Sequence, residues 1–311
     1  MEHIKVMLEY FHPWTNSAGF YYARSQGWYE EAGIDVEFVC YDAARGDTLA
    51  YLKRGEVDFG IFPTNRLLVM RENSKEVVSI ASINHGGMET IQTVKSTGIR
   101  RPADLSNKRI ALNPTPRGIA MVKHLIAADG GDPNSFIIVD SGVKEYQAED
   151  IIAGKVDATF GSYWAWELQM DSIVPEEERF YWKVDDIGAP PYHSYLLGTN
   201  QKLIDKNPQL IYIFLEITAR GFIAVANKPS IAEKVYERYV PYFPVSLITK
   251  SLSLIAATWL HEGYWGYQRP ELMEPYAKWL EKNGILEDCN IWKEACDYRF
   301  LPEGGYHIGE L

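Results

Sequence analysis

Hydrophobic and polar positions follow two different periods along the first third of the chain. Short apolar runs rich in β-branched and aromatic residues predict strands at residues 4–10, 34–41, 57–62 and 77–84. Segments with helical spacing fall between them, at residues 18–33, 47–56 and 67–74. Strand and helix therefore alternate, which indicates an open α/β sheet. The loops after Tyr10, Phe62 and Asn84 should share the carboxyl edge of that sheet, where such sheets bind ligands.

The pattern restarts after a polar connector that contains proline, near residue 95. Further strands are predicted at residues 109–114, 136–141 and 156–164, separated by helices at 118–128 and 148–153. From residue 202 onward the spacing is helical almost throughout, with breaks at NPQL, NKPS, PYFP and QRPE. A helical tail without a sheet of its own must pack on one already formed, and we expect it to pack on the first lobe.

Two lobes are expected because 311 residues exceed the usual size of a single hydrophobic core. With the helical tail assigned to it, the first lobe comprises residues 1–95 and 197–311, and the second lobe comprises residues 96–196. The chain then crosses between the lobes twice, near residues 94–97 and 194–199, which makes a two-strand hinge. The sequence therefore predicts an α/β protein of two lobes with a ligand cleft between them.

The composition argues against several classes of partner and cofactor. A formal net charge of −11 and a pI near 5.2 oppose binding to nucleic acid, which needs clustered Lys and Arg. Cys40, Cys289 and Cys296 form neither a CxxC pair nor a ligand cluster with the seven histidines, so neither a metal site nor a disulfide framework is indicated. No apolar run approaches the roughly 18 residues of a membrane span. We also expect no cofactor.

Aromatic residues make up 13% of the chain, with nine Trp and twenty Tyr, and many of them gather in one loop. The segment YFHPWTNSAGFYY near the amino terminus mixes flat rings with short hydrogen-bonding groups. A plain core would place apolar residues on one period, whereas this mixture suits a small flat ligand. We therefore expect Trp14 and Phe11 to contact such a ligand. Trp166 and either Tyr21 or Tyr22 are assigned to the core instead.

Several segments along nearly the whole chain carry a resemblance to a known group of proteins: WTNSAGFYYARSQGWYEEAGIDVEF, GEVDFGIFPTN, GIRRPADLSNKRIAL, GKVDATFGSYWAWE, NPQLIYIFLEIT and YWGYQRPELMEPYAKWLEKNGIL. Together they resemble the substrate-binding proteins of bacterial ABC transporters that are related to the fungal thiamine-pyrimidine synthase. WTNSAG and YWAWE are particular to the branch that binds pyrimidines. The resemblance implies a periplasmic-binding-protein-like fold of type II, a thiamine-type aminopyrimidine as ligand, and a transporter permease as partner.

The resemblance to the synthase itself fails at the residues that its chemistry needs. It implies a lysine for pyridoxal phosphate and a nearby histidine after VDFG, where this chain has Phe62 and Arg66. A cysteine-rich stretch should fall in residues 188–197, which here read GAPPYHSYLL. We therefore expect a binding protein and not an enzyme. The alternatives are a cytoplasmic enzyme on the same fold that acts on a related heterocycle, and a ligand-sensing domain of a regulator.

The start of the chain leaves two locations open. Met1 is followed almost at once by a predicted strand, with no basic and apolar leader. The protein is cytoplasmic if Met1 is the native start. It is periplasmic, or extracellular and anchored to the membrane, if a leader was removed.

Glu167, in the segment SYWAWEL after a predicted strand, is the residue on which the ligand hypothesis depends most. The resemblance implies that an acidic residue here meets the edge of an aminopyrimidine. Two carboxylate oxygens suit this task, because one accepts from an exocyclic NH₂ while the other faces a protonated ring nitrogen. Tyr163 and Trp164 should flank the ligand ring. The alternative is a first-turn glutamate that the helix dipole stabilises.

Polar side chains at the expected carboxyl edge complete the predicted ligand contacts. They are Asn16, Thr64, Asn65, Asn84, Tyr192 and His193. Each Asn or Thr alone suits a helix cap equally well. His12, His85 and His193 come from separate loops and have no metal-ligand spacing. In NPTPRG, Thr115 and Arg117 stand where a helix begins and suit an anionic group of the ligand, with a surface ion pair as the alternative for Arg117.

Overall fold

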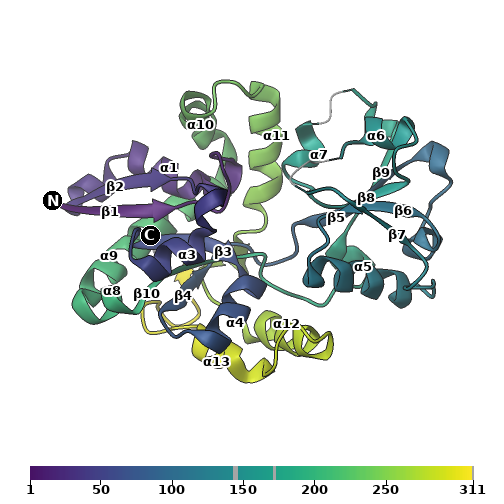
Figure 1. Cartoon of the computed structure of the whole chain (residues 1–311). Coiled ribbons are helices and arrows are strands. Elements are labelled where there is room, and N and C mark those ends of the chain that lie inside the picture. Colours follow the sequence, from purple (N-terminus) through teal and green to yellow (C-terminus); the bar gives the residue numbers. More distant parts are fainter. Residues whose placement is uncertain (143–145, 171–172, 310–311) are drawn as a thin grey trace. The chain divides into compact units, whose positions relative to one another are not determined.

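The computed structural model describes residues 1–142, 146–170 and 173–309. The chain divides into two compact units, each with a five-stranded sheet of its own (Figure 1). The first unit comprises Met1–Gly86 and Tyr192–Leu311, and the second unit comprises Gly87–Pro191. Both changes of unit come earlier in the chain than the hinge positions expected from the sequence.

The sheet of the first unit has the strand order β2-β1-β3-β10-β4. Its strands are β1 (Glu2–Met7), β2 (Ile34–Val39), β3 (Phe59–Pro63), β4 (Val77–Ser82) and β10 (Tyr195–Asn200). β1 pairs in parallel with β2 and β3, whereas β10 runs antiparallel between β3 and β4. Four of these strands were predicted from the sequence, and β10 was not.

β10 is a buried central strand, although its residues were assigned to a hinge in the sequence analysis. Every residue of Tyr195–Asn200 is buried. Gly198 permits the close approach, because a Cβ atom there would lie 2.4 Å from Phe62 Cζ and 2.5 Å from Val78 O. The strand register also shifts between Leu197 and Gly198. The return of the chain to the first unit is therefore built into the middle of its sheet.

Helices and a small sheet surround this first sheet. The helices of the unit are α1 (Ala18–Ser25), α2 (Trp28–Glu31), α3 (Thr48–Arg54), α4 (Thr64–Asn73), α8 (Gln201–Lys206), α9 (Pro208–Asn227), α10 (Glu233–Tyr239), α11 (Val245–Ala256), α12 (Pro270–Lys282) and α13 (Trp292–Ala295). The single helix expected over residues 18–33 is divided between α1 and α2, because Gly27 adopts a φ of 76°. The tail is also not entirely helical, since β11 (Leu260–His261), β12 (Tyr264–Trp265) and β13 (Tyr306–His307) pair as an antiparallel sheet.

Helix α9 packs closely on helix α1. A Cβ atom on Gly221 would lie 2.2 Å from the carbonyl oxygen of Gly19, and one on Gly19 would lie 2.3 Å from Phe222 Cδ2. The two glycines therefore let the helices approach and fix the start of α1, which follows the aromatic loop. Among the described residues, α9 is long and apolar enough to cross a membrane, but 56% of its most apolar window is buried inside the protein. It is packed as a core helix.

Much of the aromatic content of the chain lies in the core of the first unit. The rings of Phe59 and Phe214 stack with centroids 4.0 Å apart, and Phe20 meets Phe222 edge to face at 5.1 Å. Tyr29 is fully buried and its hydroxyl hydrogen-bonds Thr218 Oγ1 at 2.8 Å. The abundance of rings that suggested ligand recognition is therefore explained in large part by packing between α1, α9 and the sheet.

The second unit has the strand order β7-β6-β8-β5-β9. Its elements are β5 (Glu89–Val94), β6 (Arg109–Leu112), β7 (Ile137–Asp140), β8 (Ala158–Tyr163), β9 (Arg179–Lys183), α5 (Pro116–Ala128), α6 (Ala148–Ile152) and α7 (Glu167–Met170). β6 pairs in parallel with β7 and β8, and β5 runs antiparallel between β8 and β9. Three strands were predicted and β5 and β9 were not. As a result, the start of β5 lies beside the end of β8, where Glu89 pairs with Tyr163.

Candidate functional site

Two side-chain amides join the loops that follow β1 and β4. Asn16 Nδ2 donates to Asn84 Oδ1 at 3.2 Å, and Asn84 Nδ2 donates to Asn16 Oδ1 at 2.8 Å. Asn16 also donates to Glu9 Oε1 and accepts from Trp259 Nε1, both at 2.9 Å. Asn84 Nδ2 donates to Thr258 Oγ1 at 2.8 Å. Every amide atom of the pair is bonded, so this amide network (Glu9, Asn16, Asn84, Thr258 and Trp259) fixes the two loops to each other.

Glu9 is a member of this network that the sequence analysis missed. Its side chain lies just beyond β1 and the residue is only 5% exposed. Burial raises the pKa of the Glu9 carboxyl above its ordinary value, and contacts with Asn16, Trp14 and Ser17 oppose that rise. An acidic residue near the end of an apolar predicted strand, residues 4–10, was the signal available in the sequence. A buried carboxyl with a raised pKa is a chemical group of the kind found at ligand-binding sites.

His193 supports the same loop from the start of β10. Its Nδ1 lies 2.8 Å from the carbonyl oxygen of Asn84, and the main-chain N–H of Arg269 donates to its Nε2 at 3.0 Å. Because Nε2 accepts, the proton of the neutral ring must be on Nδ1, which donates to Asn84. Burial lowers the pKa of His193 to about 4. Both ring nitrogens are therefore engaged by the protein, and Thr64 Oγ1 donates to the carbonyl oxygen of the same residue at 2.6 Å.

Two aromatic residues of the loop after β1 were predicted to contact the ligand, and they differ greatly in their exposure to solvent. Trp14 is 1% exposed, and its carbonyl oxygen accepts from the hydroxyl of Tyr236. Phe11 is 66% exposed, with its ring 4.4 Å from that of Tyr10. Trp14 is therefore a core residue within the first unit, as is Tyr21, whereas Phe11 presents its ring to the surroundings.

Two further residues predicted at this edge have less defined roles. Asn65 is half-buried in the first turn of α4. Tyr192 is buried and stacks on Tyr276, with ring centroids 4.7 Å apart. The first unit thus brings Asn16, Asn84, Thr64 and His193 together through hydrogen bonds, and Asn65 and Tyr192 are the chain neighbours of Thr64 and His193.

In the second unit, Glu167 folds back on the strand that precedes it. Glu167 is 2% exposed, and the main-chain N–H of Tyr163, the last residue of β8, donates to its Oε2 at 2.8 Å. Trp164 follows, with its main-chain N–H bonded to Met88 O and its indole N–H bonded to Gly87 O. The buried carboxyl and the indole are therefore held at the end of β8 by main-chain contacts.

One face of the Trp164 ring carries a cation. The ammonium group of Lys183, at the end of β9, lies 3.8 Å from the ring centroid. A cation at this distance is attracted by the negative face of the indole. Trp166 is fully buried, in agreement with its assignment to the core.

Arg117 and Thr115 make local contacts at the start of α5. Arg117 Nη1 lies 2.5 Å from both carboxylate oxygens of Glu89, and both side chains are largely buried. Thr115 Oγ1 accepts from the main-chain N–H of Gly118 and caps the helix. The arginine charge is thus compensated by Glu89, which is the ion-pair alternative to an anion site. This pair stands at the same end of the second sheet as Tyr163, because Glu89 and Tyr163 are register partners.

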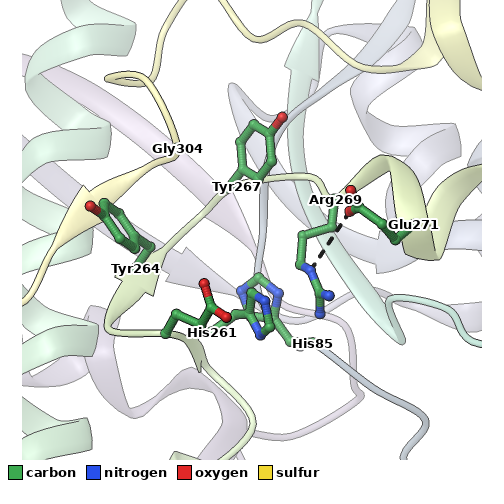
Figure 2. A pocket seen from close by; sticks show the side chains of 8 residues that line it. His85, His261, Tyr264, Tyr267, Arg269, Glu271 and Gly304 are labelled. Carbon is green, nitrogen blue, oxygen red and sulfur yellow. Dashed lines mark ion pairs between the residues drawn. The ribbon is translucent and has the colours of Figure 1, made fainter.

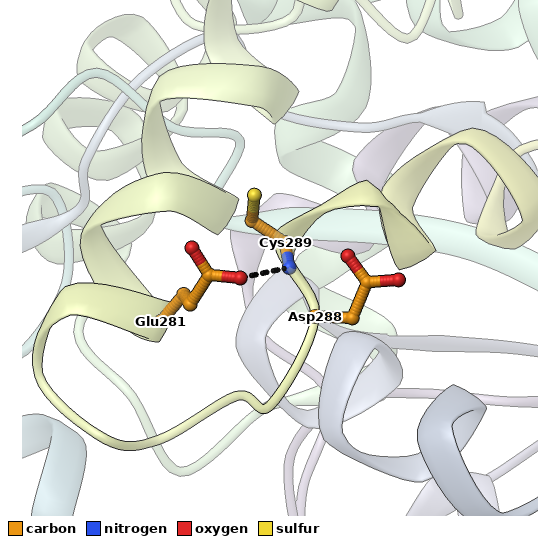
Figure 3. Close-up of side chains that lie close together, drawn as sticks. All are labelled: Glu281, Asp288 and Cys289. Carbon is orange, nitrogen blue, oxygen red and sulfur yellow. Dashed lines mark hydrogen bonds between the residues drawn. The ribbon is translucent and has the colours of Figure 1, made fainter.

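Glu281, Asp288 and Cys289 form a group whose possible metal-ligand atoms all lie within 4.8 Å of one another (Figure 3). Glu281 Oε1 accepts from the main-chain N–H of Cys289 at 2.9 Å, and Asp288 Oδ1 accepts from that of Asn290 at 2.8 Å. Burial and the carboxyl of Glu281 raise the pKa of the Cys289 thiol, which opposes the thiolate that a metal would need. The group is accounted for as a loop held by its own hydrogen bonds.

Comparisons with known proteins identify the fold and then the family. The periplasmic aliphatic sulphonate binding protein SsuA of Escherichia coli superposes with a TM-score of 0.70 at 13% identity, covering 95% of this chain and 92% of that one. The chain therefore has the periplasmic-binding-protein fold, as expected. Residues 14–232 match the family described as NMT1/THI5 like, and the chain belongs to that family. The resemblance inferred from the sequence is thereby confirmed.

Two relatives named for pyrimidine compounds align with nearly the whole chain. The formylaminopyrimidine-binding protein of Halalkalibacterium halodurans is 22% identical over 300 residues, which cover 95% of this chain and 89% of that protein. The 4-amino-5-hydroxymethyl-2-methylpyrimidine phosphate synthase of Candida albicans is 22% identical over 292 residues, which cover 91% and 84%. One is named as a binding protein and the other as an enzyme.

Proposed function

We propose that this protein binds a small, flat nitrogen heterocycle, an aminopyrimidine of the thiamine-precursor type, and delivers it to an ABC transporter. The observation that carries the proposal is the edge of the second sheet, where the buried carboxyl of Glu167 stands beside Tyr163 and Trp164. A carboxyl suits an aminopyrimidine, because it accepts from the amino group and from a protonated ring nitrogen. The relative named for binding formylaminopyrimidine supports the same ligand class.

The polar edge of the first unit supplies complementary chemistry. Glu9 and the exposed ring of Phe11 lie in the loop after β1, and the Asn16–Asn84 pair holds that loop in place. We propose that Glu9 and Phe11 contact the ligand directly, and that Asn16, Asn84 and His193 position them. Thr64, Asn65 and Tyr192 are further proposed contacts at this edge, and Thr115 and Arg117 at the edge of the second sheet.

An enzyme of the synthase type has less support. The positions at which the resemblance implies a reactive lysine and histidine are Phe62 and Arg66. Phe62 is buried in β3 with its ring against Gly198, and Arg66 Nη1 pairs with Asp47 at 3.0 Å. Neither side chain can form a Schiff base. Delivery to a transporter in turn implies a periplasmic or extracellular location, which we include in the proposal.

A calorimetric and thermal-shift screen tests the proposed ligand class. The wild-type protein is titrated with formylaminopyrimidine, hydroxymethylpyrimidine, thiamine, a flavin and pyridoxal phosphate. A ligand at a hundredfold excess over its dissociation constant stabilises the folded state by about 2.7 kcal/mol, so the true ligand raises the melting temperature clearly. Mass spectrometry of the recovered ligand distinguishes capture from catalysis, because a binding protein returns it unchanged. A turned-over aminopyrimidine would favour the enzyme.

Variants of the second unit test the role of Glu167. Glu167→Gln removes the charge but keeps the shape, and we expect it to weaken aminopyrimidine binding by about tenfold to a hundredfold, the effect of a lost charge-assisted hydrogen bond. Trp166→Phe and Glu178→Gln are the controls, since Trp166 is core and the Glu178 carboxylate lies in a solvent-exposed ion pair with Lys95. Equal weakening by Glu167→Gln and either control would remove Glu167 from the site.

A further inference from the structure

The first unit contains a pocket of about 410 Å³ that adjoins the amide network but is lined by other residues (Figure 2). It lies beyond the end of β4, between the small sheet β11-β12-β13 and the start of α12. Its lining residues are His85, His261, Glu262, Tyr264, Tyr267, Arg269, Glu271 and Gly304. The volume falls within the range of small-molecule sites in proteins, which is roughly 300 to 1,000 Å³.

His85 is the polar group at the base of this pocket. Its two ring nitrogens are buried, and neither has a hydrogen-bond partner within the part of the chain that the structure describes. Its main-chain N–H donates to Thr258 O at 2.8 Å, which fixes the residue in place. A buried imidazole without partners costs free energy unless a ligand or water occupies the adjacent space. The unsatisfied ring therefore points to an occupant of the pocket.

Donor groups from separate segments are turned toward the same space. The ring of His261 lies 5.9 Å from that of His85, and Arg269 lines the same pocket, close enough for its charge to lower the pKa of His85. The Nε atom of Arg269 is 3.9 Å from Glu271 Oε2, which is a long ion pair with a carboxylate that is 70% exposed. The guanidinium thus keeps most of its hydrogen-bonding capacity for a stronger acceptor.

We propose that this pocket binds a small oxyanion, a phosphate or a carboxylate group, held by Arg269 with His85 and His261 as further donors. A planar guanidinium forms two parallel hydrogen bonds with such a group, and each neutral imidazole adds one N–H. The rings of Tyr264 and Tyr267 at the sides of the pocket accommodate the organic part of a larger anion. Glu262 and Glu271 belong to the exposed rim and select against anions of high charge.

A metal ion fits these residues less well than an anion. Arg269 is a permanent cation and repels another cation placed beside His85. Among the described residues, the set of three possible ligands with mutually close atoms is Glu281, Asp288 and Cys289, which does not include the lining of this pocket. A bound anion would also offset the positive charge of Arg269 beside His85.

Anion binding at this pocket should strengthen as the pH falls. Burial, followed by His193, Arg269 and His261, holds the pKa of His85 well below its ordinary value. A bound anion opposes those effects and favours the protonated ring, so binding takes up a proton. The remaining charged or titratable groups that line the pocket are Glu262, Glu271, Tyr264 and Tyr267.

Calorimetry at constant ionic strength tests the proposal with inorganic phosphate, acetate and benzoate as probes. We expect saturable binding of phosphate or of a carboxylate at millimolar concentration or below, and comparison of the probes distinguishes the two anions and the role of the tyrosines. Arg269→Gln and His85→Gln should each weaken it by about tenfold or more. Arg45→Gln, which removes a surface arginine of the same unit, should leave it unchanged.

Three outcomes would overturn the proposal. They are the absence of saturable binding of all three probes to the folded wild-type protein, binding that survives Arg269→Gln, and binding of Zn²⁺ through His85 and His261 with no anion bound. The side-chain change at Arg269 keeps the main-chain N–H that bonds His193, so the variant should fold. If the Arg269→Gln variant does not fold, the wild-type protein is titrated with phosphate and its histidine NMR signals are followed. The proposal then requires that the signal of His85 shifts and that the shift saturates.

Discussion

Replacing Asn16 with alanine tests the amide network most directly. The Asn16 side chain makes four hydrogen bonds, two as a donor to Glu9 and Asn84 and two as an acceptor from Asn84 and Trp259. All four are removed by Asn16→Ala. No part of the main chain changes, so the variant isolates the contribution of this side chain to the loop after β1.

The expected loss follows from the groups that are left without partners. Glu9 Oε1, Asn84 Oδ1 and Trp259 Nε1 lose their hydrogen bonds from or to Asn16, while Asn84 Nδ2 keeps its bond to Thr258. Each orphaned buried group costs about 1–3 kcal/mol. Water that enters the vacated space recovers part of this cost. We therefore expect the free energy of unfolding to fall by about 3–5 kcal/mol.

Urea unfolding monitored by tryptophan fluorescence and by circular dichroism measures this loss. Asn65→Ala is the matched control, because Asn65 is a half-buried asparagine of the same unit, and its loss should stay below about 1 kcal/mol. Asn84→Ala combined with Asn16→Ala should cost less than the sum of the single changes, since the two amides bond each other directly. A loss below about 1 kcal/mol for Asn16→Ala, or strict additivity, would refute the account of the network.

Two further predictions concern packing and pH. Gly221→Ala places a methyl group 2.2 Å from the carbonyl oxygen of Gly19, so α1 and α9 must separate, and thermal unfolding should show a loss of about 1–3 kcal/mol; an unchanged melting temperature would contradict this packing. Burial raises the folded-state pKa of Glu9, so its contribution to stability is fully present below its unfolded-state pKa and is lost as pH rises through the folded-state value. Glu9→Gln should flatten the dependence of the unfolding free energy on pH in this range. The same dependence in the variant and in the wild-type protein would argue against a raised pKa of Glu9.

The local periods of the sequence were sufficient to predict most of the elements, whereas the family was inferred from the resemblance of several motifs to known proteins. Strands β1 to β4 and β6 to β8 fall where apolar runs predicted them, because a buried strand must carry such a run. Gly33, the last residue of the helical segment predicted over residues 18–33, has a left-handed φ of 79° just after α2, a conformation that glycine adopts without strain. These features depend on neighbouring residues alone, and the sequence records them directly.

Tertiary structure alone decided the pairing of distant segments. Residues 195–200 have no pattern that distinguishes a hinge from a strand, and they become β10 because Gly198 fits against Phe62 between β3 and β4. Asn16 and Asn84 were each compatible with a helix cap or a ligand contact, and the sequence analysis did not single out Glu9. Their roles became specific only when the fold removed them from water, because a buried polar group must find its partner in the chain and that partner is set by geometry.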